Sequence, residues 1–480
     1  MAVVDQNGRV AEVARQALSV FRQDFYQCLR KRADAMFELC DAVLCASGPV
    51  TSLPELTMDS VHRRGHGAMY DALAAGEIDL VSLRRSLAGL ALPRSSQGQL
   101  RLAVDVTPWP RPDAECSPQR SHCHRPCRCD AVRQTIPGWN YSIVAALESG
   151  RSSWTAPLDA ARLSPDDDVT EVTATQIRDL IGRLRGAGHL RADDPNVLIA
   201  LDAGYDVVRL THLLADLPVD LVGRLRSDRV FYGPTPPRRP GRGRPVRHGD
   251  DVKLADPATH PSAEARTEGT HPRFGAYVLH AYGHLHPRLT GRNAGWANHA
   301  GPYPIIEGTV IHVQVERLPG NRKPKPMWLW HSNPDASQLD LARLFAAFLR
   351  RFDLEHTFRF FKQTLGWTRP RVRTPEQADR WTWLILAAYT QLRLARATAE
   401  DLRRPWEKPL RPEQLTPGRV RRGFPRIRRI TADPAAAPKT TRPGPGRPKG
   451  SANKHRAPRY PVGKHSKVDV LSPVDTTQNG

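Results

Sequence analysis

The segment from Phe348 to Lys362 constrains the fold of this chain more than any other part of the sequence. Its apolar residues recur at helical spacing, which predicts a single helix with one buried face. At roughly 100° per residue, one stripe of side chains then shares an arc of about 60°; its members are Phe348, Arg351, Glu355 and Lys362. A lone carboxylate flanked by two cations suits a metal ligand beside phosphate contacts. An amphipathic helix with ordinary surface charges would show the same pattern.

Two aspartates upstream lie where a sheet would place its chemistry. Residues 196–201 form an apolar run that predicts a buried strand, and Asp202 follows it directly. Open α/β sheets place their functional groups at the carboxyl ends of such strands. Residues 100–106 predict a second short strand, which carries Asp105 and which we expect Pro108 to end. Either aspartate alone is more typical of a helix cap or a turn.

The helix pattern resembles one family closely, the DDE-type transposases of bacterial insertion sequences. One group of these enzymes has the signature Tyr-x2-Arg-x3-Glu-x6-Lys. Arg351, Glu355 and Lys362 match this signature. Phe348 stands in the tyrosine position, and in that group the tyrosine contacts the phosphate backbone during a hairpin step. The resemblance therefore implies that Phe348 is one of the DNA-binding residues, although a phenylalanine has no hydroxyl for this phosphate contact.

The resemblance also implies a catalytic triad of Asp105, Asp202 and Glu355. In the family the first acid lies on the first strand, the second at the end of the fourth, and the glutamate on a late helix. Such a triad holds two Mg²⁺ ions about 3.5–4 Å apart, and Mn²⁺ can replace them. One ion activates the attacking water or 3′-hydroxyl, and the other stabilises the leaving 3′-oxygen. Arg351 and Lys362 would contact phosphates near the cut.

The sequence predicts an α/β fold, a mixed sheet with flanking helices, in five regions; the resemblance implies that the sheet is RNase H-like, that the first region binds DNA and that a mainly β insertion interrupts the core. A helical DNA-binding region comes first, the catalytic core follows in two parts around a mainly β insertion, and a basic, Pro-rich tail that we expect to be disordered comes last. Their bounds are 1–97, 98–230, 231–326, 327–406 with the Glu355 helix, and 407–480. Within the first region, residues 81–87 are compatible with the second helix of a helix-turn-helix.

Composition favours a nucleic-acid partner. The chain has 71 Lys and Arg against 49 Asp and Glu, a formal net charge of +22 at pH 7. An excess of this size favours a polyanion, nucleic acid before a membrane surface. We find no signal-peptide pattern, and the longest apolar stretch, near residues 383–389, is too short to span a bilayer. We therefore expect a soluble intracellular protein. The resemblance implies a bacterial cytoplasmic protein that binds double-stranded DNA, both terminal inverted repeats and target. The family implies a dimer on DNA.

A short repeat offers a second set of DNA contacts. Residues 239–245 and 442–448 share the pattern Arg-Pro-Gly-x-Gly-Arg-Pro, with Arg244 and Arg447 in equivalent positions. An extended Gly-Arg-Pro segment suits a narrow minor groove, where the negative potential is strongest. Arginine-rich linker composition would produce the same repeat.

Four cysteines cluster after Asp105, with two histidines between them; they are Cys116, Cys123, Cys127 and Cys129, with His122 and His124. This cluster has the ligand types for zinc, but it lacks the paired spacing of a strong zinc site. The sequence around it is rich in Pro and Arg, so we expect a solvated loop.

Other functions are compatible with parts of the sequence. A decayed or domesticated transposase fold could bind DNA without cutting it, but such a copy would be expected to have lost one of the three acids. A structure-selective nuclease could use the same core without recognising specific ends. A zinc-dependent binding module around the cysteine cluster would explain little of the remaining chain.

Overall fold

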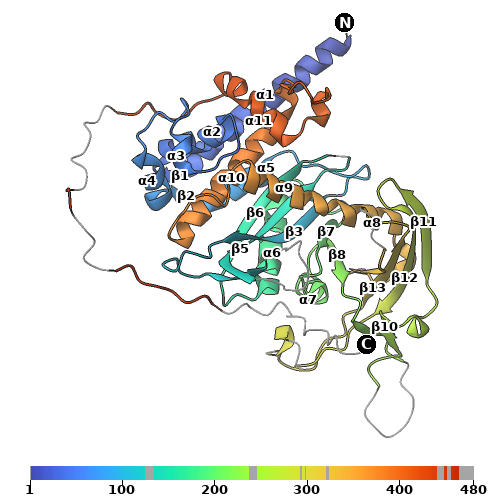
Figure 1. Ribbon diagram of the computed structural model, residues 1–480. Coiled ribbons are helices and arrows are strands. Elements are labelled where there is room, and N and C mark those ends of the chain that lie inside the picture. The colour runs from blue at the N-terminus through green and yellow to red at the C-terminus, as the bar shows by residue number, and fades with distance from the viewer. Residues whose placement is uncertain are drawn as a thin grey trace, which may run out of the picture. The chain divides into compact units, whose positions relative to one another are not determined.

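The computed structural model describes residues 2–124, 135–150, 152–236, 246–291, 294–297, 299–319, 324–439, 448–450 and 456–463. Figure 1 labels the elements. The chain divides into two compact units. Unit 1 contains Met1–Ser164, Asp179–Pro195 and Arg351–Gly463, and unit 2 contains Pro165–Arg178, Asn196–Arg350 and Lys464–Gly480. Both units combine helices with strands, which confirms the predicted α/β class.

The sheet of unit 1 is built around one long strand. Strand β5 (Thr135–Leu147) pairs with β3 (Arg101–Pro110) along one edge. On its other edge it pairs with β4 (Ser121–His124) near its start and with β6 (Thr155–Leu163) further along, and all these pairs are antiparallel. The expectation that Pro108 ends the first strand is wrong, because β3 continues through it and Pro108 lies opposite Asn140. An antiparallel pair alternates hydrogen-bonded and non-bonded positions, so a residue without an N–H can occupy a position of the second kind.

The helices of unit 1 come from both ends of the chain. They are α1 (Ala2–Cys28), α2 (Ala33–Cys45), α3 (Leu53–Leu56), α4 (Gly67–Ala75), α5 (Leu80–Gly89), α9 (Phe352–Gln363), α10 (Pro375–Ala395) and α11 (Pro417–Arg429). Short strands β1 (Leu29–Lys31) and β2 (Glu77–Ile78) pair with each other. The predicted helix at residues 81–87 is confirmed as α5, where Arg84 donates to Asp159 at 2.9 Å and Arg85 is exposed.

One hydrophobic core joins these helices to the sheet. It includes large side chains from α1, α2, β3, β5, α10 and α11; among them are Phe21, Phe37, Trp109, Trp139, Trp381, Tyr389 and Phe424. Helix α10 begins with a capping box in which the side chains of Thr374 and Gln377 bind each other's backbone, and Pro375 occupies its first turn. Trp381 and Trp383 are buried, as expected for core residues.

The expectation of disorder after Trp406 is wrong for residues 417–429, which form α11. Val420, Phe424 and Ile427 of this helix are buried in the core of unit 1. Its arginines are matched by partners elsewhere in the unit: Arg419 pairs with Asp401 at 2.9 Å, and Arg421 donates to the carbonyl of Val43 at 2.9 Å. The segment alone could not bury enough apolar surface to fold, but unit 1 supplies the surface on which it docks.

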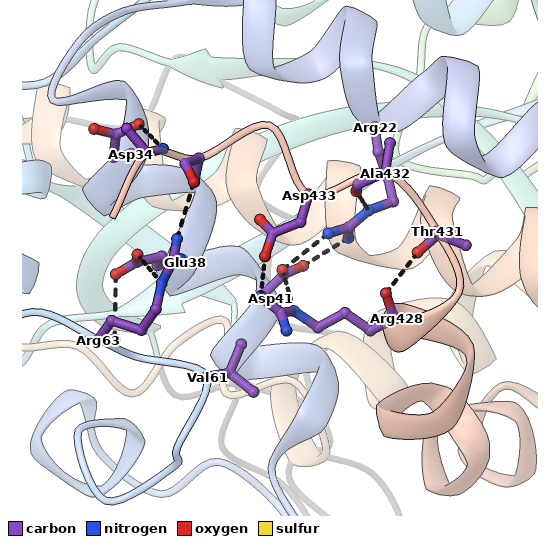
Figure 2. A network of polar contacts seen from close by, with 12 residues as sticks. Arg22, Asp34, Glu38, Asp41, Val61, Arg63, Arg428, Thr431, Ala432 and Asp433 are labelled. Carbon is purple, nitrogen blue, oxygen red and sulfur yellow. Dashed lines mark hydrogen bonds and ion pairs between the residues drawn. The ribbon is translucent and has the colours of Figure 1, made fainter. Parts of the chain in front are cut away.

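A buried ionic cluster holds the end of α11 against α1 and α2, and Figure 2 shows it. Asp41, with its side chain 1% exposed, accepts from Arg22 at 2.7 Å and from Arg428 at 2.6 Å. Arg22 also donates to the carbonyl of Ala432 at 2.7 Å. Nearby, Arg63 pairs with Glu38 at 2.8 Å. Charged groups from residues 22–63 and 428–432 therefore satisfy one another inside the helical part of unit 1.

The strands of unit 2 pair in mixed directions. Strand β7 (Val197–Leu201) runs parallel to β8 (Val219–Leu225). Antiparallel pairs then continue from β8 to β14 (Met327–His331), β13 (Gly308–Val315), β12 (Gly275–Leu285) and β11 (Ala265–His271). Helix α8 (Leu341–Arg350) packs on this sheet, and α7 (Val207–Leu213) follows β7. The strand predicted from the apolar run at residues 196–201 is confirmed as β7.

Much of the region expected as a β-rich insertion, residues 231–326, is sheet. It contributes β11, β12 and β13 to the sheet of unit 2. A separate hairpin pairs β9 (Val230–Tyr232) with β10 (Asp251–Lys253). Helix α6 (Val169–Gly186) contributes residues to both units. Among the residues that the structure describes, no helix has both the length and the apolar character needed to cross a bilayer.

Candidate active site

Strand β3 carries Asp105 at the edge of the core of unit 1. Leu102, Ala103 and Val104 are fully buried, so the strand before Asp105 is held by packing. The Asp105 side chain is 16% exposed, and its Oδ1 accepts a hydrogen bond from the Val106 N–H at 2.9 Å. The strand therefore presents one partly exposed carboxylate from a rigid support.

The single helix predicted from Phe348 to Lys362 is in fact two helices, and that expectation is wrong. Helix α8 ends at Arg350 and α9 begins at Phe352. Arg351 lies between them with helical angles, φ −50° and ψ −33°, and its carbonyl accepts from the Leu354 N–H at 3.0 Å. The change to an i to i+3 bond tightens the first turn of α9 and separates the two helices.

This division places Phe348 apart from the other residues of the signature. Phe348 belongs to α8, and its side chain, 6% exposed, lies in the hydrophobic core of unit 2. A side chain buried to that extent has little surface to offer DNA. The suggested contact of Phe348 with DNA therefore finds no support in its position, whereas its aromatic character is explained by packing.

Arg351 joins the carboxylates of Asp105 and Glu355. Its Nη1 lies 3.1 Å from Asp105 Oδ2, and its Nη2 lies 3.5 Å from Glu355 Oε1. The Arg351 side chain is 11% exposed and that of Glu355 is 39% exposed. Residues far apart in the sequence, one on β3 and one on α9, thus converge on one cation within unit 1.

Lys362 lies about two turns after Glu355 on the same face of α9, and it is only partly exposed. Its Nζ lies 5.6 Å from the centre of the Trp367 ring. Burial lowers the pKa of Lys362 to about 8, and the negative charge of Asp105 acts in the opposite direction. The ammonium group of Lys362 is therefore partly desolvated, and it interacts electrostatically with Asp105.

Replacing Lys362 with Met is expected to stabilise the protein by about 1 kcal/mol at pH 7, because it removes a partly desolvated charge and keeps the contact with Trp367. The folded-state pKa lies near 8 and the ordinary value is 10.5, so between these pH values the unfolded chain binds more protons. Wild-type stability should rise through that window, and the advantage of the variant should shrink. Urea unfolding at pH 7 and pH 10 tests this; a variant less stable than wild type at pH 7 would contradict it.

Asp202 belongs to unit 2, where it directly follows β7. Its carbonyl accepts from the Tyr205 N–H at 3.3 Å, which closes a turn and leaves the side chain half-buried. Asp206, a few residues later, caps α7 by accepting from the Arg209 N–H at 3.1 Å. The nearby acid thus has a structural task, and Asp202 keeps the strand-end position predicted for it.

Other predicted site residues are only partly described. Arg244 and Arg447 lie outside the described residues, as do Cys127 and Cys129. Cys123 is fully buried on β4, and burial raises its pKa to about 12; Cys116 is partly exposed. Among the described ranges, no three His, Cys, Asp or Glu side chains gather into a group that could hold a metal ion. The zinc suggestion therefore stays a prediction.

Sequence reasoning missed the contact between Arg351 and Asp105. Helical spacing predicted that Arg351 lies beside Glu355, because residues four apart share a face. No local signal indicates which strand this face meets. The conjunction depends on how α9 packs on β3, which is a tertiary contact.

Comparison with known proteins agrees with this geometry. Residues 24–277 match the model of a family described as DDE superfamily endonuclease. The match covers more than half of the chain; it includes Asp105 and Asp202 and ends before Glu355. No curated protein matches the chain. Nucleases of this family act on DNA and generally use divalent metal ions, and the mixed α/β architecture agrees with their RNase H-like fold. The chain therefore belongs to the DDE superfamily of endonucleases.

Proposed function

We propose that the protein is a DNA transposase that binds the terminal inverted repeats of an insertion sequence and carries out metal-dependent strand cleavage and strand transfer. The observation that carries this proposal is the convergence of Asp105 and Glu355 on Arg351, in a chain of the DDE endonuclease family. Asp105 on β3 and Glu355 on α9 are far apart in the sequence, and both contact Arg351 within unit 1.

Asp105, Asp202 and Glu355 would hold the metal ions. Their carboxylate oxygens are the hard ligands that Mg²⁺ and Mn²⁺ prefer. The Asp105 and Glu355 side chains are 16% and 39% exposed, so both are in contact with solvent. Bound Mg²⁺ would activate the attacking oxygen and stabilise charge on the leaving 3′-oxygen. The protein would supply these carboxylates from a strand, a strand end and a helix.

Positively charged side chains of unit 1 would bind the DNA. Lys362 lies on α9 with Glu355, and its partial desolvation strengthens its attraction to a phosphate. Arg351 has the planar fork that suits bidentate phosphate contacts. Membership in the Tyr-Arg-Glu-Lys group belongs to this proposal, with the tyrosine position occupied by buried Phe348.

Cleavage of a labelled duplex carrying the DNA that flanks the coding sequence tests the proposal. The reaction is run with Mg²⁺, with Mn²⁺ and with EDTA. Metal-dependent cuts at the repeat ends support a transposase. Cuts without end preference would favour a structure-selective nuclease. Tight binding without cutting in any metal would reject catalysis and favour a non-catalytic DNA-binding protein on the same fold.

Replacing both Arg244 and Arg447 with Ala is expected to weaken DNA binding and to reduce its salt dependence. Two lost phosphate neutralisations lower the slope of log K against log salt by about 2. Titration of a fluorescent duplex between 50 and 200 mM salt measures the slope. Arg426→Ala is the control, because that exposed arginine is paired with Glu400. Substitutions are preferable to deleting residues 407–480, since the deletion would remove α11. An unchanged slope would exclude both arginines as DNA contacts.

A further inference from the structure

Arg351 occupies an unusual position for a residue that would contact DNA. Its guanidinium is directed at two carboxylates, and only 11% of the side chain is exposed. Nη1 contacts Asp105 Oδ2 and Nη2 contacts Glu355 Oε1, so its charge is shared between the two acids. The other Asp105 oxygen accepts from the Val106 N–H. Arg351 therefore contacts the same carboxylates that are proposed to hold metal ions.

A guanidinium and a divalent ion would use the same carboxylate oxygens. Mg²⁺ binds carboxylate oxygen directly, at about 2.0–2.1 Å. Arg351 contacts Asp105 Oδ2 and Glu355 Oε1 through different terminal nitrogens at 3.1 and 3.5 Å. Because the ion and the guanidinium carry like charges and share these oxygens, they exclude each other when one ion takes both acids.

We propose that Arg351 competes with the divalent ion for Asp105 and Glu355, and that metal binding releases its guanidinium toward a DNA phosphate. This inference rests on the proposed function. The Arg351 backbone is already helical, so rotation of the side chain is sufficient for the exchange. Once released from the two carboxylates, the planar guanidinium of Arg351 can bind a phosphodiester through two N–H groups in the same bidentate manner. The metal-loaded site would then gain a phosphate contact that the metal-free site lacks.

The direction in which metal affinity changes when Arg351 is removed distinguishes competition from simple positioning of the acids. If Arg351 only held the acids in place, its loss would weaken metal binding. If Arg351 competes, its loss removes a positive charge from beside the two acids, so a divalent ion that binds them is less strongly opposed. Metal affinity of the protein without DNA should therefore increase when the charge of Arg351 is removed.

The experiment is a Mn²⁺ titration of the full chain without DNA, with free Mn²⁺ measured by electron paramagnetic resonance. Arg351→Gln is the main variant, because glutamine keeps a hydrogen-bond donor and removes the charge. We expect it to bind Mn²⁺ about tenfold more tightly than wild type or better. The Mn²⁺ affinity of Arg351→Lys should lie between those of wild type and Arg351→Gln, because an ammonium group lacks the two separate nitrogens that contact both acids. Arg396→Gln is the matched control and should leave the affinity unchanged; Arg396 pairs with Glu148 at 3.2 Å in unit 1, and both side chains are 20% exposed.

Glu355→Gln should abolish this binding, which assigns the titrated site. If wild type binds Mn²⁺ and Arg351→Gln binds it equally or more weakly, competition is rejected while the proposed function stands. If neither protein binds Mn²⁺, both the competition and the proposed metal site are rejected. Tighter binding in Arg351→Gln that Arg396→Gln does not share supports the inference.

Discussion

Glu355→Gln is expected to lower the rate of metal-dependent DNA cleavage by about 10³-fold or more, because a carboxylate ligand contributes several kcal/mol of transition-state stabilisation through its metal ion. Specific DNA binding should persist. Glu355 is 39% exposed, and its contact with Arg351 is long, at 3.5 Å, so stability should change little. Cleavage of the flanking duplex and a binding titration on the same preparation separate the two effects.

The other two acids provide the comparison. Asp105→Asn and Asp202→Asn should abolish cleavage in the same way. Asp206→Asn is the matched control, because asparagine can also cap α7 and the residue lies close to Asp202 in sequence. It should cleave at the wild-type rate. Near-normal cleavage by any variant of the three proposed ligands would show that this residue is misassigned.

Asp41→Ala is expected to lower the free energy of unfolding by about 3–5 kcal/mol, because it leaves buried positive charge without its partner. The Asp41 side chain is 1% exposed and that of Arg22 is fully buried. Arg22 Nη1 and Nη2 contact the two Asp41 oxygens at 2.7 and 2.9 Å, and Arg428 adds a third contact at 2.6 Å. Gln391 still accepts from Arg22 at 2.6 Å, but it carries no charge.

The loss should also loosen the end of α11, since Arg428 and the carbonyl of Ala432 are joined to α1 and α2 through this cluster (Figure 2). Urea unfolding measures the stability, and limited proteolysis near residues 428–436 measures the release of this segment. Asp433→Ala is the control: it removes only a pair with Arg428 at a side chain that is 34% exposed, and should cost less than about 1 kcal/mol. A similar cost for both variants would argue against a buried cluster.

Local patterns were sufficient for much of the sheet. The patterns at residues 100–106 and 196–201 predicted strands that the structure contains as β3 and β7. The second is an apolar run, as expected for a strand buried on both faces. The prediction at Pro108 was wrong because a missing N–H weakens a strand only where the partner strand would accept that hydrogen bond. This depends on the register between β3 and β5. The helix at residues 81–87 was also predictable from its period.

The tail shows the limit of composition. Residues 417–429 are basic and contain prolines, which predicts disorder when the segment is considered alone. In unit 1, its arginines meet carboxylates and carbonyls from residues hundreds of positions away, such as Asp41 and Val43. Apolar residues such as Phe424 are buried at the same time. Composition counts charges, but it does not reveal whether each charge has a partner.

The sequence by itself indicated that Asp105 lies on a strand, Asp202 at a strand end and Glu355 on a helix, because strand and helix periods are local properties of the chain. It also determined the strong positive charge that favours a nucleic-acid partner. Only the tertiary structure decided that the helix divides at Arg351, that Phe348 is a core residue, and that Arg351 joins Asp105 to Glu355. These features depend on packing between residues distant in sequence, and a local pattern carries no information about such partners.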